Sequence, residues 1–242
     1  MKAGGFELET VEFAGAEPAL VFLHEGLGAV ELWRDFPERL AALSGRRALL
    51  YSRAGHGQSD VPDGDRTPAF MHEEALDVLP EVLAAAGIER PVLVGHSDGG
   101  SIALIHASQH PVSGLILLAP HVFVEDVTVA NIEEARETFA TTDLGARMAR
   151  YHRDAERTFR LWNDIWLAPE FRAWNIEEVL GGVTAPALLI QGEQDQYGTL
   201  AQIEAIERGV SGPVERAVLD ARHAPHLEAP EATLAAALEF LR

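Results

Sequence analysis

The stretch VLVGHSDGG, residues 92–100, decides how the whole chain is interpreted. Its apolar half predicts a buried strand, and the residues after Ser97 predict a helix. Ser97 is then the centre of a G-x-S-x-G motif, in which a sharp strand-to-helix turn exposes the serine at the edge of a sheet. Gly95 and Gly99 are small, as this turn requires. Because the N–H groups of the following helix point at the same place, we expect Ser97 to be a nucleophile.

Outward from this motif, short apolar runs alternate with helical stretches. The expected strands are 19–24, 48–53, 92–96, 115–119, 187–191 and 214–219, and the expected helices are 37–44, 72–86, 99–109, 200–208 and 230–241. Most of these runs are continuously apolar, which is typical of strands buried on both faces. The pattern predicts an α/β fold with a mostly parallel, twisted sheet flanked by helices. Residues 6–14 alternate instead and predict an exposed antiparallel edge hairpin.

Residues 122–180 interrupt this alternation. No convincing strand is found there, the pattern is helical, and three tryptophans are present at positions 162, 166 and 174. We expect a helical cap of residues 122–180 over the carboxyl edge of the sheet, inserted into a core of residues 1–121 and 181–242. An ordinary pair of crossover helices is the alternative, although the segment is long for one.

A serine nucleophile needs a base, and the base needs a carboxylate that orients it. Asp195 follows the fifth expected strand, and His223 follows the sixth, so the chain presents serine, acid and histidine in the order typical of this architecture. Glu193 is the alternative carboxylate. His226 is the alternative base, but it lies nearer to the final helix, where we expect it to pack or to cap.

The loop HEGLG, residues 24–28, follows the first expected buried strand. Acyl transfer requires two N–H donors where the oxyanion forms. The N–H of Asp98 is one candidate because it follows the nucleophile, and the loop supplies the other. We assign the loop donor to Gly26, with Leu27 as the alternative, and expect His24 to brace the loop.

These motifs together resemble the α/β-hydrolase superfamily over nearly the whole chain. The HG-x-G-like loop, GHSDGG, the GE-x-D segment and the H-x-P-H-x-E-x-P ending occur in the expected order, and the likeness is greatest to the branch of capped esterases, lactonases and carbon–carbon hydrolases. The resemblance implies an α/β-hydrolase fold. It also implies a catalytic triad of Ser97, Asp195 and His223, with Gly26 and Asp98 as oxyanion donors.

Two departures from the family pattern bear on function. Glu25 stands where the family usually has glycine, and it either changes the backbone angle or pairs with Arg53. Hydrolases of ring-cleavage products usually carry tryptophan after the base and asparagine before the nucleophile, where this chain has Ala224 and His96. Dehalogenases and related epoxide hydrolases use an aspartate nucleophile, so Ser97 argues against both.

We therefore expect a serine hydrolase that cleaves a carboxylic ester or lactone through an acyl-enzyme, without metal or organic cofactor. A carbon–carbon hydrolase of vinylogous diketo acids is the alternative, and a non-catalytic ligand-binding member of the fold is a third reading. The aromatic residues of the expected cap suggest an apolar pocket for a small ester-like substrate. The candidates that would line it are His121, Trp162 and Trp166, with further aromatic side chains at positions 159, 171 and 174.

Composition limits the classes of partner and compartment. The chain has 242 residues, 47% of them hydrophobic, and a formal net charge of −19. A surface this acidic repels phosphate backbones and anionic lipids, so nucleic acids and membranes are poor partners. Cysteine is absent, which excludes disulfides, thiolate catalysis and cysteine metal sites. With no secretory signal and no apolar run long enough to span a bilayer, we expect a cytoplasmic protein.

Overall fold

The computed structural model describes residues 1–242 and contains a seven-stranded sheet with the order β3-β5-β4-β6-β7-β8-β9. The strands are β1 (Lys2–Ala3), β2 (Phe6–Glu7), β3 (Thr10–Phe13), β4 (Ala16–Leu23), β5 (Arg46–Tyr51), β6 (Val92–His96), β7 (Gly114–Leu118), β8 (Ala187–Gly192) and β9 (Val214–Leu219). Every neighbouring pair from β5 to β9 is parallel, and only β3 runs antiparallel, against β5. The predicted mostly parallel sheet is confirmed.

The N-terminal edge differs from the prediction. Residues 6–14 do not form one hairpin, because β2 pairs with β1 in a separate two-stranded sheet while β3 joins the main sheet alone. The alternating pattern of Thr10–Phe13 predicted an exposed antiparallel edge correctly. It could not reveal the partner of β2, because Lys2–Ala3 is too short to show any periodicity.

Helices connect the parallel strands, as parallel pairing requires. They are α1 (Phe36–Ser44), α2 (Phe70–Glu73), α3 (Leu79–Ala86), α4 (Asp98–Ala107), α5 (Asp126–Thr141), α6 (Leu144–Met148), α7 (Ala155–Trp166), α8 (Ala201–Gly209), α9 (Pro225–Glu228) and α10 (Pro230–Phe240), with shorter turns η1 (Val30–Trp33), η2 (Glu74–Val78), η3 (Pro169–Ala173) and η4 (Glu177–Gly182). The expected helix 72–86 corresponds to α2, η2 and α3. Its middle is a wider π-helical turn just before Pro80, which has no N–H to donate. No helix combines the length and the apolar character needed to cross a bilayer.

Two apolar layers sandwich the sheet, one on each face. Along β4, Leu20 and Phe22 belong to the layer under α1 and α10, whereas Val21 and Leu23 belong to the layer that α3, α4 and α8 cover. Successive side chains of a strand point to opposite faces, so a strand covered on both sides must be apolar throughout. This double burial fixes the sheet, and the loops at its carboxyl edge are held on a rigid base.

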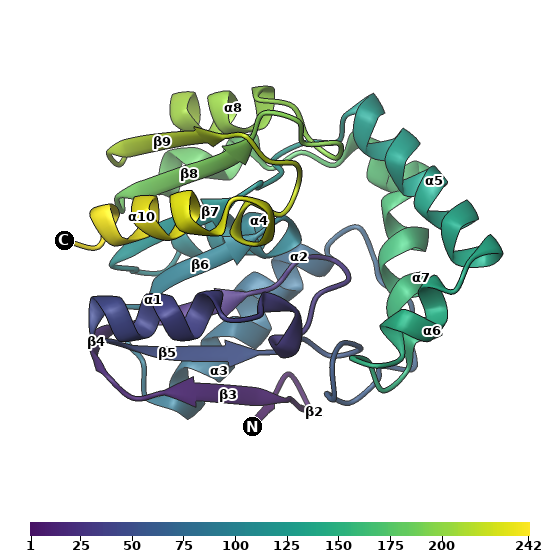
Figure 1. Cartoon of the computed structure of the whole chain (residues 1–242), viewed down its shortest axis with the longest axis horizontal. Helices are drawn as coiled ribbons and strands as arrows, with labels where there is room; N and C mark the ends of the chain where they lie inside the picture. Colours follow the sequence, from purple (N-terminus) through teal and green to yellow (C-terminus); the bar gives the residue numbers. More distant parts are fainter.

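The helices of residues 122–180 lie beyond the carboxyl ends of the parallel strands, with α5, α6 and α7 stacked beside one another (Figure 1). Asp154 caps the N-terminus of helix α7, because its carboxylate accepts the N–H of Arg157 at 2.9 Å. Its buried face carries Phe159, Trp162 and Trp166. These rings belong to the same apolar cluster as one face of the sheet, so the division into core and cap stays a prediction from the sequence.

Buried histidines make stability depend on pH. Burial lowers the pKa of seven of the ten histidines, namely His24, His56, His96, His106, His121, His152 and His226. For His226 the pKa falls to about 3, chiefly through burial and secondarily through His223. A folded pKa below the unfolded value of about 6.5 means that the unfolded chain binds the proton first. The contribution of these neutral histidines to the unfolding free energy is therefore fully present above about pH 6.5, and it is lost as the pH falls toward the folded pKa.

We expect His226→Phe to weaken this pH dependence. The ring of His226 packs 4.9 Å from that of Trp33, so phenylalanine keeps the packing and removes the titrating group. Between pH 7 and pH 5 the variant should lose about 2 kcal/mol less of its unfolding free energy than the wild type. Urea unfolding at both pH values measures this. An unchanged difference would show that His226 is not held neutral in the folded protein.

Candidate active site

The turn between β6 and α4 carries Ser97 in a strained conformation. Its φ of 52° and ψ of −118° lie in a region that side-chain-bearing residues rarely occupy, at a cost of about 1–3 kcal/mol. The turn is closed by glycines: a Cβ on Gly95 would overlap the carbonyl oxygen of Gly99, and one on Gly99 would overlap that of Leu23. This geometry holds the serine hydroxyl at the carboxyl edge of the sheet.

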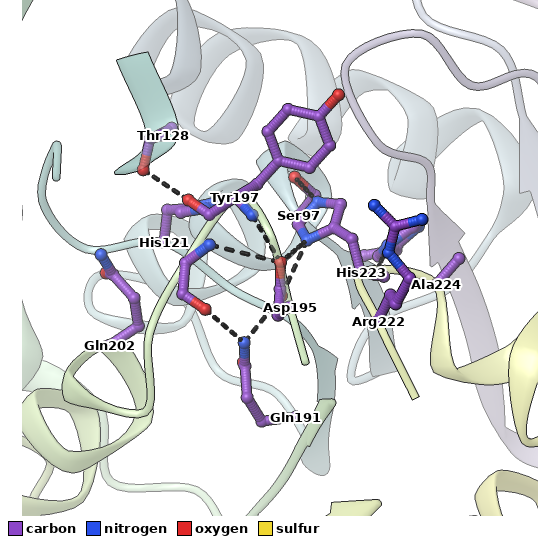
Figure 2. A network of polar contacts seen from close by, with 12 residues as sticks. Ser97, His121, Thr128, Gln191, Asp195, Tyr197, Gln202, Arg222, His223 and Ala224 are labelled. Carbon is purple, nitrogen blue, oxygen red and sulfur yellow. Dashed lines mark hydrogen bonds and ion pairs between the residues drawn. The ribbon is translucent and has the colours of Figure 1, made fainter. Parts of the chain in front are cut away.

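Three side chains from separate loops form one hydrogen-bonded chain. The hydroxyl of Ser97 donates to His223 Nε2 at 2.9 Å, and His223 Nδ1–H donates to Asp195, whose Oδ2 lies at 2.8 Å and Oδ1 at 2.9 Å. Figure 2 shows His223 between the other two. The structure thus brings together all three predicted residues. Of the alternatives, the side chain of Glu193 is exposed, and His226 is buried beside Trp33 with no bond to Ser97 or Asp195.

The carboxylate of Asp195 is held by donors other than the histidine. Oδ1 accepts the N–H groups of Tyr197 and Gly198 at 2.8 and 3.3 Å, and Oδ2 accepts the amide of Gln191 at 2.7 Å (Figure 2). Burial by itself raises the pKa of Asp195, but the neighbouring His223 with its hydrogen bond, the N–H of Tyr197 and the nearby His121 outweigh it and lower the pKa below its ordinary value. The carboxylate stays ionised and can fix the tautomer of His223.

Neither Gln191 nor Tyr197 was predicted as part of the site. The only sign of Gln191 in the sequence is a polar residue at the end of a continuously apolar strand. Tyr197 contributes through its backbone N–H, which no side-chain pattern can reveal.

The loop of Asp195 is tied to the start of α5. The hydroxyl of Thr128 donates to the carbonyl of Tyr197 (Figure 2), and the hydroxyl of Thr199 donates to the carboxylate of Glu125 at 2.7 Å. The amide oxygen of Gln202 accepts the N–H of Val122 at 2.8 Å. The beginning of the helical segment and the loop that carries the acid are therefore one connected unit.

Two backbone N–H groups are placed as candidate oxyanion donors. The N–H of Asp98 is the first of α4, where no helix carbonyl can accept it. The N–H of Gly26 has no acceptor within the protein, whereas that of Leu27 donates to the carboxylate of Glu25. Of the two loop residues that the sequence left open, Gly26 therefore has the free donor.

A cavity of about 240 Å³ opens over Ser97 and His223. Its other lining residues are Glu25, Gly26, Leu27, His96, Asp98, His121, Thr128, Ile132, Trp162, Trp166, Gln196, Tyr197, Ala224 and Glu228. All three predicted pocket residues, His121, Trp162 and Trp166, are among them. The further aromatic residues Phe159, Phe171 and Trp174 do not line the cavity but pack in the apolar core.

Comparison with known proteins identifies the family. A sequence profile described as "Alpha/beta hydrolase family" matches residues 20–237. The chain belongs to the alpha/beta hydrolase family. Serine hydrolase BPHL of Homo sapiens is 26% identical over 247 aligned residues, which cover 98% of this chain and 84% of that protein. The expected superfamily is confirmed, and membership of this family makes the protein a hydrolase.

Solved structures agree on the fold of this alpha/beta hydrolase. The enol-lactonase from Burkholderia xenovorans LB400 superposes with a TM-score of 0.77 at 22% identity, covering 99% of this chain and 98% of that one. The esterase EaEST from Exiguobacterium antarcticum superposes with a TM-score of 0.76 at 20% identity, covering 99% and 97%. At such identities the likeness establishes the fold of the hydrolase and leaves its substrate open.

Hydrogen bonds from His24 and Arg53 hold the backbone of the Glu25 loop in this hydrolase. His24 Nδ1–H donates to the carbonyl of Glu25 at 2.7 Å, and His24 Nε2 accepts the N–H of Arg53 at 3.0 Å, as one neutral tautomer allows. The guanidinium of Arg53 donates to the carbonyls of His24 and Glu25. Arg53 thus binds the backbone of Glu25, and the alternative of an ion pair with its carboxylate is wrong.

We expect Gly26→Ala to impair the hydrolase. A Cβ at this position would overlap the indole of Trp162, so the loop and its free N–H must shift. Loss of one oxyanion donor should lower kcat by roughly 10²- to 10³-fold. Steady-state hydrolysis of 4-nitrophenyl acetate measures this, with Gly181→Ala as the control because its Cβ would meet no atom within 4 Å.

The double variant Gly26→Ala/Trp162→Ala should recover part of the lost kcat relative to Gly26→Ala, because it removes the overlapping ring. Wild-type kcat in Gly26→Ala would contradict the assignment of Gly26 as a donor.

Proposed function

We propose that this alpha/beta hydrolase cleaves a carboxylic ester or lactone through an acyl-enzyme on Ser97. The observation that carries the proposal is the continuous hydrogen-bonded chain from Ser97 through His223 to Asp195, which faces a cavity. In this arrangement the serine hydroxyl already points its proton at Nε2. The imidazole can therefore accept the proton as the oxygen attacks an acyl carbon.

The remaining steps follow from the same groups. The N–H groups of Gly26 and Asp98 stabilise the oxyanion of the tetrahedral intermediate. His223 then gives its proton to the leaving alcohol, and the acyl group stays on Ser97. Water, deprotonated by His223, attacks the acyl-enzyme, the bond between the acyl carbon and the Ser97 oxygen breaks, and His223 returns the proton to Ser97 as the acid leaves. Asp195 stabilises the imidazolium in both steps. No step draws on a metal or an organic cofactor.

The cavity supports a small substrate with an apolar or aromatic part. Trp162, Trp166 and Ile132 supply apolar surface next to the nucleophile. An enol-lactonase and an esterase share the fold at nearly full length, which is compatible with an ester or lactone. Cleavage of vinylogous diketo acids has less support, because these substrates are anionic and no arginine or lysine lines the cavity. A cytoplasmic location, favoured by the absence of cysteine, is part of the proposal.

A fluorophosphonate probe tests the proposal directly. The folded protein should gain one phosphonyl group, peptide mass spectrometry should place it on Ser97, and hydrolysis of 4-nitrophenyl acetate should stop as the label accumulates. Ser108, whose hydroxyl donates to the carbonyl of Ile105 in the last turn of α4, should stay unlabelled and serves as the internal control. A folded protein that neither labels at Ser97 nor hydrolyses the ester would favour a non-catalytic ligand-binding role.

A further inference from the structure

Glu25 occupies a place in the cavity that the proposed reaction does not explain. Its side chain lines the same cavity as Ser97, directly before the candidate donor Gly26. One carboxylate oxygen, Oε2, accepts the N–H of Leu27, which folds the side chain back over its own loop. The other, Oε1, has no hydrogen-bond partner in the protein and is not sealed from solvent. A carboxylate oxygen is thus available to whatever occupies the cavity.

No basic side chain of the protein forms an ion pair with this carboxylate, although His223 and Arg53 lie close enough to lower its pKa. Arg53 is directed to the backbone carbonyls of His24 and Glu25, and no ion pair within 4.0 Å includes Glu25. No arginine or lysine lines the cavity, whereas two further acids, Asp98 and Glu228, do. The wall of the cavity therefore holds three acidic side chains and no arginine or lysine, next to the group that would attack the substrate.

The protonation of Glu25 decides the conditions of a test. Burial raises the pKa of its carboxyl group, and nearby Asp98 raises it further. The hydrogen bond from the Leu27 N–H and the neighbouring His223 and Arg53 act in the opposite direction without cancelling the effect of burial. Charge selection requires the ionised carboxylate, which a mildly alkaline assay pH favours.

We propose that Glu25 selects substrates by charge, so that the cavity takes esters with a positively charged group near the scissile bond and rejects those with a carboxylate there. This inference rests on the proposed ester hydrolysis. An ammonium group would pair with Oε1 of Glu25, and the aromatic rings of Trp162 and Trp166, which also line the cavity, can attract a cation. A substrate carboxylate would meet the like charge of Glu25, and no arginine or lysine lines the cavity to pair with it.

Three aryl acetates of closely matched shape test the proposal: 3-(trimethylammonio)phenyl, 3-tert-butylphenyl and 3-carboxyphenyl acetate. The first two differ almost only in charge. Each kcat/KM is divided by the rate constant for hydroxide hydrolysis of the same ester, which removes the different leaving-group reactivities. We expect the wild type to prefer the cationic over the anionic ester by roughly 100-fold or more, with the neutral ester between them.

Glu25→Gln is the decisive variant, because glutamine keeps an oxygen for the Leu27 N–H and removes the charge. The ratio of cationic to anionic ester should fall about tenfold or more. Since the ratio is taken within one protein preparation, partial unfolding of the variant cancels. Glu31→Gln is the matched control: Glu31 is exposed in η1, six residues along and outside the cavity, and the variant should keep the wild-type ratio.

The outcomes separate this inference from the proposed function. If the neutral ester is hydrolysed and Ser97 labels with fluorophosphonate, but the wild type shows no charge preference or Glu25→Gln keeps it, the role of Glu25 is wrong and ester hydrolysis stands. If Glu31→Gln lowers the ratio as much as Glu25→Gln does, the preference belongs to the overall charge and the assignment to Glu25 fails. If no ester is hydrolysed and Ser97 does not label, both proposals fail.

Discussion

Ser97→Ala should lower kcat for 4-nitrophenyl acetate by roughly 10⁵- to 10⁶-fold. Alanine removes the only atom that can form the acyl-enzyme, and the 2.9 Å hydrogen bond to His223 is lost with it. The activity that is left reflects the two N–H donors and substrate binding, which act without the nucleophile. Stopped assays with purified protein measure the loss, and intact-mass spectrometry after a short pulse of substrate should detect acylated wild type only.

Ser108→Ala is the control for this result, because Ser108 lies just after α4 and its hydroxyl bonds only to the carbonyl of Ile105. It should retain wild-type kcat. Near-normal turnover by Ser97→Ala, with normal folding, would remove the basis for the proposed mechanism.

Asp195→Asn should lower kcat by roughly 10⁴-fold while the protein remains folded. Asparagine can still accept the N–H of Tyr197, but its amide nitrogen donates where the carboxylate accepted from His223. The imidazole then turns to the wrong tautomer and no longer accepts the proton of Ser97. The loss should appear mainly in kcat and little in KM, because Asp195 does not line the cavity.

Glu193→Gln makes the same change of charge two residues away and provides the matched control. Its side chain is exposed, so kcat should stay near the wild-type value. Equal losses in Glu193→Gln and Asp195→Asn would show that the acid was assigned to the wrong residue.

The parallel strands of the sheet were predicted closely from the sequence, and for the buried strands the physical cause is simple. Residues 92–96 and 214–219 form β6 and β9 with the predicted bounds, and the other predicted strands of the parallel sheet begin or end within a few residues of the prediction. Strand β6 is buried along its whole length, and such a run is visible without any tertiary information, whereas β9 is an edge strand that carries Glu215 and Arg216 and is only partly buried. The hairpin predicted at the N-terminal edge was wrong, because the pairing of β1 with β2 involves only two residues on each side.

The candidate site could be predicted where the chemistry requires a residue type at a fixed place after a strand. Ser97, Asp195 and His223 are of this kind. The contacts that hold these side chains in place could not be predicted, because they join segments that are distant in the sequence. The hydrogen bond from Thr128 to the carbonyl of Tyr197 spans 69 residues, and the contact of Gly26 with Trp162 depends on where α7 is placed.

Aromatic residues of the helical segment show the same limit. Trp166 lines the cavity and donates to the carboxylate of Asp98 at 3.2 Å, while Trp174 lies 6.0 Å from it, ring to ring, and faces the core. Both are equally apolar in the sequence, and only the tertiary placement of α7 and of the residues after η3 decides which ring lines the cavity.

The bonds between the start of α5 and the acid loop limit how substrate can enter. If α5 swung away from the sheet at its first turn, it would pull on the carbonyl of Tyr197 and displace the carboxylate that orients the imidazole. A moving lid hinged there would switch the enzyme off each time it opened. We therefore expect this end of α5 to stay in place during turnover, so that substrate enters without displacing it.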